Sequence, residues 1–188
     1  MKPEVIIRTY ITQIRPRFNE ELDWFRRQPR LSEAIRLAAL AVNSKGKRYS
    51  HQRRLRKTTL EQARDILLEN EERIRQSQDF DDLFGFLERL LSPVKGLGEL
   101  YIYDTALRIG AKIGVSPERV YLHAGTRVGA KALGFDGRMK TLEVSQLPEW
   151  LQLLQPHEIE DVLCIFKDKL KAREQAMPEE LIGRSRFR

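Results

Sequence analysis

Apolar residues recur every three or four positions along most of the chain, which is the spacing that places them on one face of an α-helix. The pattern predicts an all-α fold: one compact domain over 1–176 with about eight helices, followed by a flexible basic tail over 177–188. The predicted helices are 3–28, 32–42, 59–75, 79–91, 99–113, 117–133, 147–154 and 156–175.

Individual residues indicate where these helices begin or change direction. Pro16 lies inside the first helix and has no N–H to donate, so it predicts a kink there. Thr59 is followed three residues later by Gln62, which is the spacing of a capping box, and Thr58 with Glu61 offers the same spacing one residue earlier. Helix starts are also predicted at three further residues whose side chains can cap free amides: Ser32, Asp79 and Ser116.

Positive charge is concentrated in one short segment. The chain has 34 basic and 27 acidic residues in 188, a net charge of +7. Residues 45–57, KGKRYSHQRRLRK, contain no acidic residue, and without their basic residues the two charge types balance at 27 each. We call this stretch the basic segment and interpret it as a surface that neutralises the phosphates of a nucleic acid. Its basic residues are Lys45, Lys47, Arg48, Arg53, Arg54, Arg56 and Lys57.

Two other interpretations of the basic segment stay open. It is also typical of a solvated linker whose charge is offset by acidic neighbours after folding. Alternatively, it docks an acidic protein. The nearest acidic residues along the chain are Glu61, Asp65, Glu69, Glu71 and Glu72.

Other features narrow the class of protein. No apolar run approaches the roughly 18 residues of a membrane helix, and the start of the chain lacks the apolar core of a signal peptide. Cys164 is the only cysteine, so an intramolecular disulfide is excluded, and no Cys/His group has the spacing of a zinc site. We therefore expect a soluble cytoplasmic protein with no membrane partner, no metal and no cofactor.

The stretch 80–114 predicts two helices joined by a tight turn around Gly96-Leu97-Gly98. The glycines let the backbone turn closely, and Leu97 anchors the turn in the core. The first N–H groups of the second helix would then face outward, where the helix dipole favours an anion. Lys95 adds positive charge beside them. This pattern resembles a helix-hairpin-helix element, whose usual ligand is a DNA phosphate. The alternative is an ordinary tight turn between two helices, in which Gly-apolar-Gly also occurs.

The stretch from 80 to 131 resembles the helix-hairpin-helix superfamily, and in particular its DNA glycosylases. In the glycosylases with lyase activity, a nucleophilic lysine follows the second hairpin glycine by two residues, and that position is Leu100 here. The catalytic aspartate lies two residues before a histidine that matches His123, and that position is Tyr121. The resemblance therefore implies DNA binding and argues against this family's chemistry.

A polar group on the two helices after the turn is a candidate catalytic site. Asp104 and Arg108 are four residues apart and predict an ion pair on one helix face. His123 and Arg127 have the same spacing on the next predicted helix. If the helices pack antiparallel, Asp104 orients His123 as a base or phosphate ligand, with Arg127 beside them. The alternative is a structural hydrogen-bonded network at a close contact between helices.

The resulting prediction is a protein that binds double-stranded DNA through its phosphates with weak sequence preference. The residues predicted to bind are those of the basic segment and the turn residues Lys95, Gly96, Leu97 and Gly98. One alternative is a divergent base-excision or nuclease-like enzyme that uses Asp104, His123 and Arg127. The other is an interaction module whose basic segment docks an acidic protein.

Overall fold

The structure, a computed structural model, describes residues 1–170, and these are mostly helical. The α-helices are α1 (Pro3–Thr9), α2 (Arg15–Arg26), α3 (Leu31–Ala39), α4 (Lys57–Glu69), α5 (Glu71–Arg75), α6 (Phe80–Leu91), α7 (Glu99–Ile113), α8 (Ala124–Ala132), α9 (Glu149–Gln152) and α10 (Pro156–Ile165). A π turn (Tyr10–Ile14), two 3-10 turns (Ser50–Gln52 and Val144–Gln146) and two strands, β1 (Val120–Tyr121) and β2 (Thr141–Leu142), complete the described elements.

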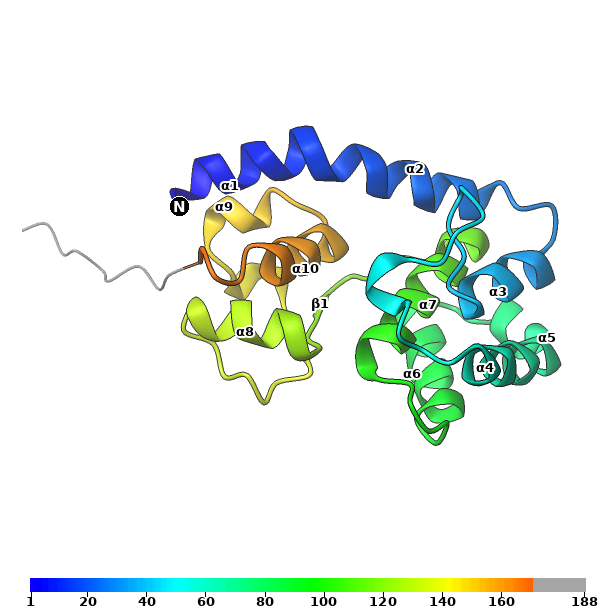
Figure 1. Ribbon diagram of the computed structural model, residues 1–188. Coiled ribbons are helices and arrows are strands. Elements are labelled where there is room, and N and C mark those ends of the chain that lie inside the picture. Colours follow the sequence, from blue (N-terminus) through cyan, green and yellow to red (C-terminus); the bar gives the residue numbers. More distant parts are fainter. Residues whose placement is uncertain (171–188) are drawn as a thin grey trace, which may run out of the picture.

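Two hydrophobic clusters form the core of this compact domain. The larger one packs α3, α4, α5, α6 and α7 together around buried side chains such as Leu60, Leu83 and Ile109. The smaller one gathers β1, β2, α8, α9 and α10 around Leu151 and Leu163. Figure 1 shows these elements as two groups, with α3 to α7 on one side and α8 to α10 on the other.

The N-terminal helix joins the two clusters. Figure 1 shows α1, the π turn and α2 as one long helix that runs along both groups. Ile6 of α1 is buried in the smaller cluster, whereas Leu22 and Phe25 of α2 are buried in the larger one. The predicted kink at Pro16 takes the form of the π turn just before it, because the missing proline N–H interrupts the ladder of i to i−4 hydrogen bonds. The helix thereby holds both sides of the cleft described below.

The prediction of an all-α fold with a helix over 117–133 was wrong in part. Residues 120–121 form β1, which pairs antiparallel with β2, and Leu122 N–H donates to Lys140 O at 2.8 Å. The pairing buries Val120 and Leu122 in the smaller cluster, and this burial outweighs the helix-start preference of Ser116-Pro117. Helix α8 therefore begins only after His123.

Of the other predicted helix starts, one is confirmed and two lie earlier in the chain than predicted. Asp79 caps α6, as predicted, by accepting a hydrogen bond from Asp82 N–H at 2.7 Å. However, α3 begins before Ser32, and α4 begins at Lys57, before both predicted capping boxes. The predicted tail 177–188 and the end of the last predicted helix lie outside the described residues.

Candidate functional site

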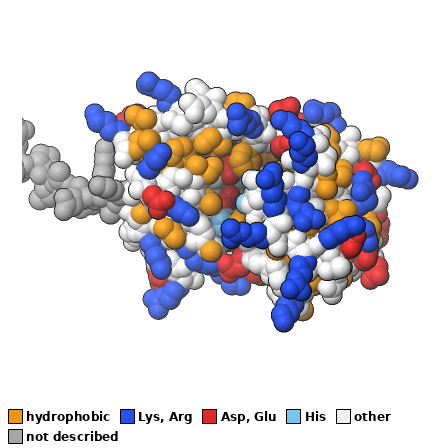
Figure 2. Space-filling model, viewed as in Figure 1, with side chains coloured by type: hydrophobic (Ala, Val, Ile, Leu, Met, Phe, Trp, Pro, Cys, Tyr) orange, Lys and Arg blue, Asp and Glu red, His pale blue; other side chains and the backbone are white. Residues whose placement is uncertain are grey.

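A cleft opens between the two clusters, with a cavity of about 410 Å³. It is lined by residues of α2, α7 and α10 and by the part of the basic segment around Tyr49 and His51. Figure 2 shows acidic and histidine side chains in the hollow between the two halves of the molecule, with Lys and Arg side chains along one rim. The acidic side chains that line the cavity are Glu21, Asp104, Glu160 and Asp161.

Asp104 of α7 fixes one wall of the cleft. Its Oδ2 accepts hydrogen bonds from Gln52 Nε2 at 2.8 Å and Arg108 Nη2 at 3.0 Å, and His51 Nε2 lies 2.7 Å away. The guanidinium of Arg108 also stacks 3.9 Å from the centre of the Tyr49 ring. Burial alone would raise the pKa of Asp104, but Arg108 and His51 outweigh it, and the pKa is lowered. The carboxylate therefore stays charged and orients His51 at the cleft surface.

His123 and Glu160 form the second polar pair. The Nε2 atom of His123 contacts Glu160 Oε1, and both side chains are buried. Burial lowers the pKa of His123 and raises the pKa of Glu160 well above its usual range. The His123 Nδ1 atom is buried and has no hydrogen-bond partner among the described residues.

Asp161, next to Glu160 on α10, is also buried. It accepts a hydrogen bond from Tyr10 Oη at 2.9 Å. Burial, together with the neighbouring Glu160, raises its pKa well above the usual range. Neither carboxylate has a Lys or Arg partner within residues 1–170. Perturbed carboxyl groups of this kind in a cleft are typical of functional sites.

The predicted catalytic group is only partly assembled. Asp104 pairs with Arg108, as predicted, and not with His123. Arg127 points elsewhere, because its guanidinium binds the carboxylate of Glu99 at the start of α7. The close helix contact also differs from the alternative considered, since α8 packs on α10 and not on α7. A Cβ atom on Gly129 would lie 2.2 Å from Leu163 O.

Sequence reasoning missed three residues of the cleft, namely His51, Glu160 and Asp161. In the sequence, His51 stands out only as one residue of the basic segment. The apolar stripe of α10 placed Glu160 and Asp161 on its polar face, where solvent exposure is the usual outcome. The long N-terminal helix covers part of that face, as the bond from Tyr10 to Asp161 shows. No local sequence signal could have indicated this burial.

The basic segment lies along the cleft and is largely exposed. Of its seven basic residues, only Arg48 is partly buried, and its guanidinium donates to Leu55 O at 2.9 Å. Lys57 lies 3.7 Å from Glu61. Five of the seven basic residues are exposed and have no ion-pair partner among the described residues. These five are Lys45, Lys47, Arg53, Arg54 and Arg56.

The turn between α6 and α7 has the backbone that its glycines suggested. Gly96 adopts a φ of +98°, in the left-handed region, and Gly98 is the N-cap of α7. Leu97 is partly buried against the larger cluster, while Lys95 is exposed. A Cβ atom on Gly96 would lie 4.0 Å from Thr59 Cγ2. The turn is thus next to the first turn of α4, which directly follows the basic segment.

Comparison with family models, curated proteins and solved structures gives no match for this chain. No helix within residues 1–170 combines the length and the apolar character needed to cross a membrane. The cleft and its rim are therefore the features of the chain that bear on its function.

Proposed function

We propose that the protein binds double-stranded DNA through the phosphates, with weak sequence preference. The observation that carries this proposal is the unpaired charge of the basic segment. Of the acidic neighbours that could have offset it, Glu61 reaches only Lys57, while Asp65, Glu71 and Glu72 pair with Arg64 or Arg75. The five free basic side chains, joined by Lys95 on the neighbouring turn, are thus available for a polyanion.

The start of α7 would supply a second phosphate-binding element, as the resemblance to a helix-hairpin-helix implies. The first N–H groups of this 15-residue helix receive no side-chain cap. Glu99 in its first turn would repel a phosphate, but Arg127 neutralises it. The N–H groups and the helix dipole can therefore hold one backbone phosphate while the basic segment contacts the next ones. The free basic residues lie outside regular helices, which favours backbone contact over base reading.

A salt series of duplex binding tests this proposal. If the six free basic residues each neutralise one phosphate, the slope of log K against log salt is about −5, and affinity falls about a thousandfold between 50 and 200 mM salt. In an Arg53/Arg54/Arg56→Ala variant about three contacts remain, and the fall shrinks to about 40-fold. Fluorescence anisotropy with a labelled duplex of arbitrary sequence measures both.

The matched control is an Arg8/Arg27/Arg30→Ala variant, which loses the same charge. All three side chains are exposed. Arg27 and Arg30 flank the far end of α7, where Lys112 Nζ donates to Arg26 O at 3.1 Å. We expect this variant to keep the wild-type slope. Equal slopes for the two triple variants, or no duplex binding at low salt, would refute the proposal and favour a protein-docking role for the basic segment.

The pair of His51 and Asp104 favours a second candidate, an enzyme that acts on the bound nucleic acid. His51 belongs to the basic segment, lines the cavity and is oriented by the partly buried Asp104 carboxylate, which is how a general base is commonly held. The assay is strand cleavage or base release from end-labelled oligonucleotides in single turnover. A His51→Gln variant is expected to lose the activity and keep duplex affinity. Absence of any product with wild-type protein would contradict this candidate.

A further inference from the structure

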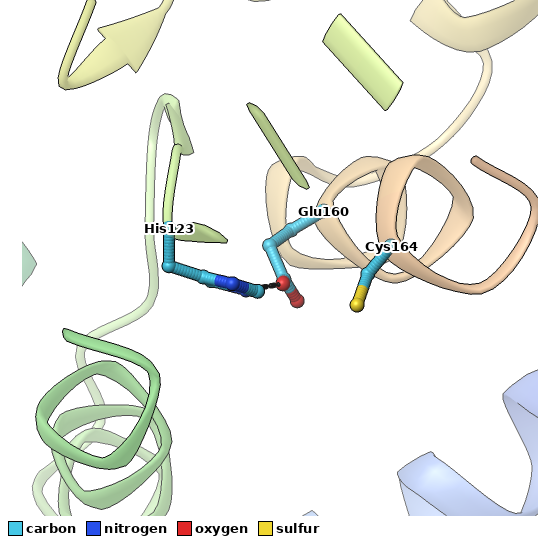
Figure 3. A group of neighbouring side chains, drawn as sticks. All are labelled: His123, Glu160 and Cys164. Atoms are coloured by element: carbon cyan, nitrogen blue, oxygen red, sulfur yellow. Dashed lines mark hydrogen bonds and ion pairs between the residues drawn. The ribbon is translucent and has the colours of Figure 1, made fainter. Parts of the chain in front are cut away.

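His123, Glu160 and Cys164 meet at the wall of the cleft, although they come from two separate elements. His123 immediately precedes α8, whereas Glu160 and Cys164 lie four residues apart on one face of α10. Figure 3 shows the imidazole directed at the Glu160 carboxylate, with the Cys164 sulfur beside it. One ligand atom from each residue can be chosen so that all three lie within 4.8 Å of one another.

We propose that these three side chains bind a transition-metal ion of the zinc class. Nitrogen, carboxylate oxygen and thiolate sulfur are the donors that such ions take, and two ligands four residues apart on a helix suit a single ion. In a tetrahedral zinc site the ligand atoms lie about 3.3 to 3.8 Å apart. The present ligand atoms lie within 4.8 Å of one another, so metal binding would require rotations about the side-chain bonds of Glu160 and Cys164 to bring them into that range.

Two further observations point to a ligand at this place. His123 is only 2% exposed, and its Nδ1 atom has no hydrogen-bond partner within the described residues. One nitrogen of the buried ring is therefore not used by the fold. In addition, Gly125 leaves room for the sulfur. A Cβ atom at Gly125 would lie 2.7 Å from Cys164 Sγ, which is closer than non-bonded atoms approach. Any other residue at Gly125 would therefore force the Cys164 thiol out of its present position.

The charge balance supports the same conclusion. The Glu160 carboxyl is buried and has no Lys or Arg partner among residues 1–170. A divalent cation would supply positive charge beside the buried carboxyl, and the Glu160 carboxyl and the Cys164 thiol would each release a proton to solvent as they bind it. Glu160 and Cys164 also line the 410 Å³ cavity, so the fourth position of the ion faces the cleft. Three protein ligands with an open fourth position are typical of catalytic zinc sites.

Titration with Co²⁺ alone, followed by displacement with Zn²⁺, tests this site without assuming any activity. The wild-type protein, first freed of metal with EDTA, should bind one Co²⁺ per chain. Binding should produce a thiolate-to-cobalt charge-transfer band and the visible bands of four-coordinate cobalt, and Zn²⁺ should abolish both. Because Cys164 is the only cysteine, the charge-transfer band reports on this residue alone.

The variants follow from the ligand set. Cys164→Ser should lose the charge-transfer band, and Glu160→Gln and His123→Gln should each weaken Co²⁺ binding by more than about tenfold. His157→Gln, a histidine replacement on the same helix but outside the cluster, should bind as the wild type does. Circular dichroism in EDTA confirms that each variant is folded. A missing band in wild type, a band that persists in Cys164→Ser, or one Co²⁺ per two chains would each overturn the proposal.

Discussion

Replacing Glu160 by glutamine removes a buried carboxyl group and keeps its shape. The amide oxygen can still accept a hydrogen bond from His123, so the packing against α8 is retained. In the wild-type protein freed of metal, burial raises the pKa of Glu160. The folded state therefore holds this proton at a pH where the unfolded chain, with a pKa of about 4.3, has already released it.

The sign and size of the effect follow from this difference in pKa. Because the folded state binds more protons, the contribution of Glu160 to stability is fully present below pH about 4.3 and declines as pH rises toward its folded pKa. The decline is at most about 1.4 kcal/mol per pH unit. Between pH 5 and 7, Glu160→Gln should thus gain stability relative to wild type, by at most about 3 kcal/mol.

The free energy of unfolding, measured with urea in EDTA at pH 5, 6, 7 and 8, checks this expectation. Comparing the two proteins at each pH cancels the titration of groups that the substitution leaves unperturbed, including His157, whose pKa burial lowers. Glu20→Gln, at an exposed site on α2, is the matched control and should track the wild type at every pH. A difference that stays constant with pH, or that shrinks as pH rises, would refute the reasoning about Glu160.

Three further substitutions test the packing and hydrogen bonding of the fold. Gly129→Ala should destabilise the protein by about 1 to 3 kcal/mol, because its Cβ atom would lie 2.2 Å from the backbone oxygen of Leu163. Thermal unfolding measures this loss of stability. Gly85→Ala on α6 should instead stabilise by about 0.5 to 1 kcal/mol, since its Cβ meets only the tip of a flexible arginine; a lower melting temperature would contradict this. Tyr10→Phe should cost about 1 to 3 kcal/mol at pH 7 by leaving Asp161 without its donor, and an unchanged urea midpoint would show that this bond contributes nothing.

Local sequence patterns were reliable where the structure depends on neighbours along the chain. The three-to-four-residue spacing predicted most of the helices, Asp79 predicted its own cap, and Pro16 predicted the irregularity in the first helix. The pairing of Asp104 with Arg108 also followed, because residues four apart share a helix face. The charge of the basic segment was equally visible, because an acid-free stretch of 13 residues is a property of composition.

The site itself depended on tertiary structure. His51 and Asp104 are 53 residues apart, and His123 and Glu160 are 37 apart, so each contact arises only when distant segments of the chain pack together on one side of the cleft. The burial of Glu160 depends on neighbours from distant parts of the chain, and the same holds for β1, which its pairing with β2 and the smaller cluster hold in extended form. Sequence periodicity records which face of a helix is apolar. Which elements face each other is decided by the packing of the whole chain, and that packing brought the polar residues of this cleft together.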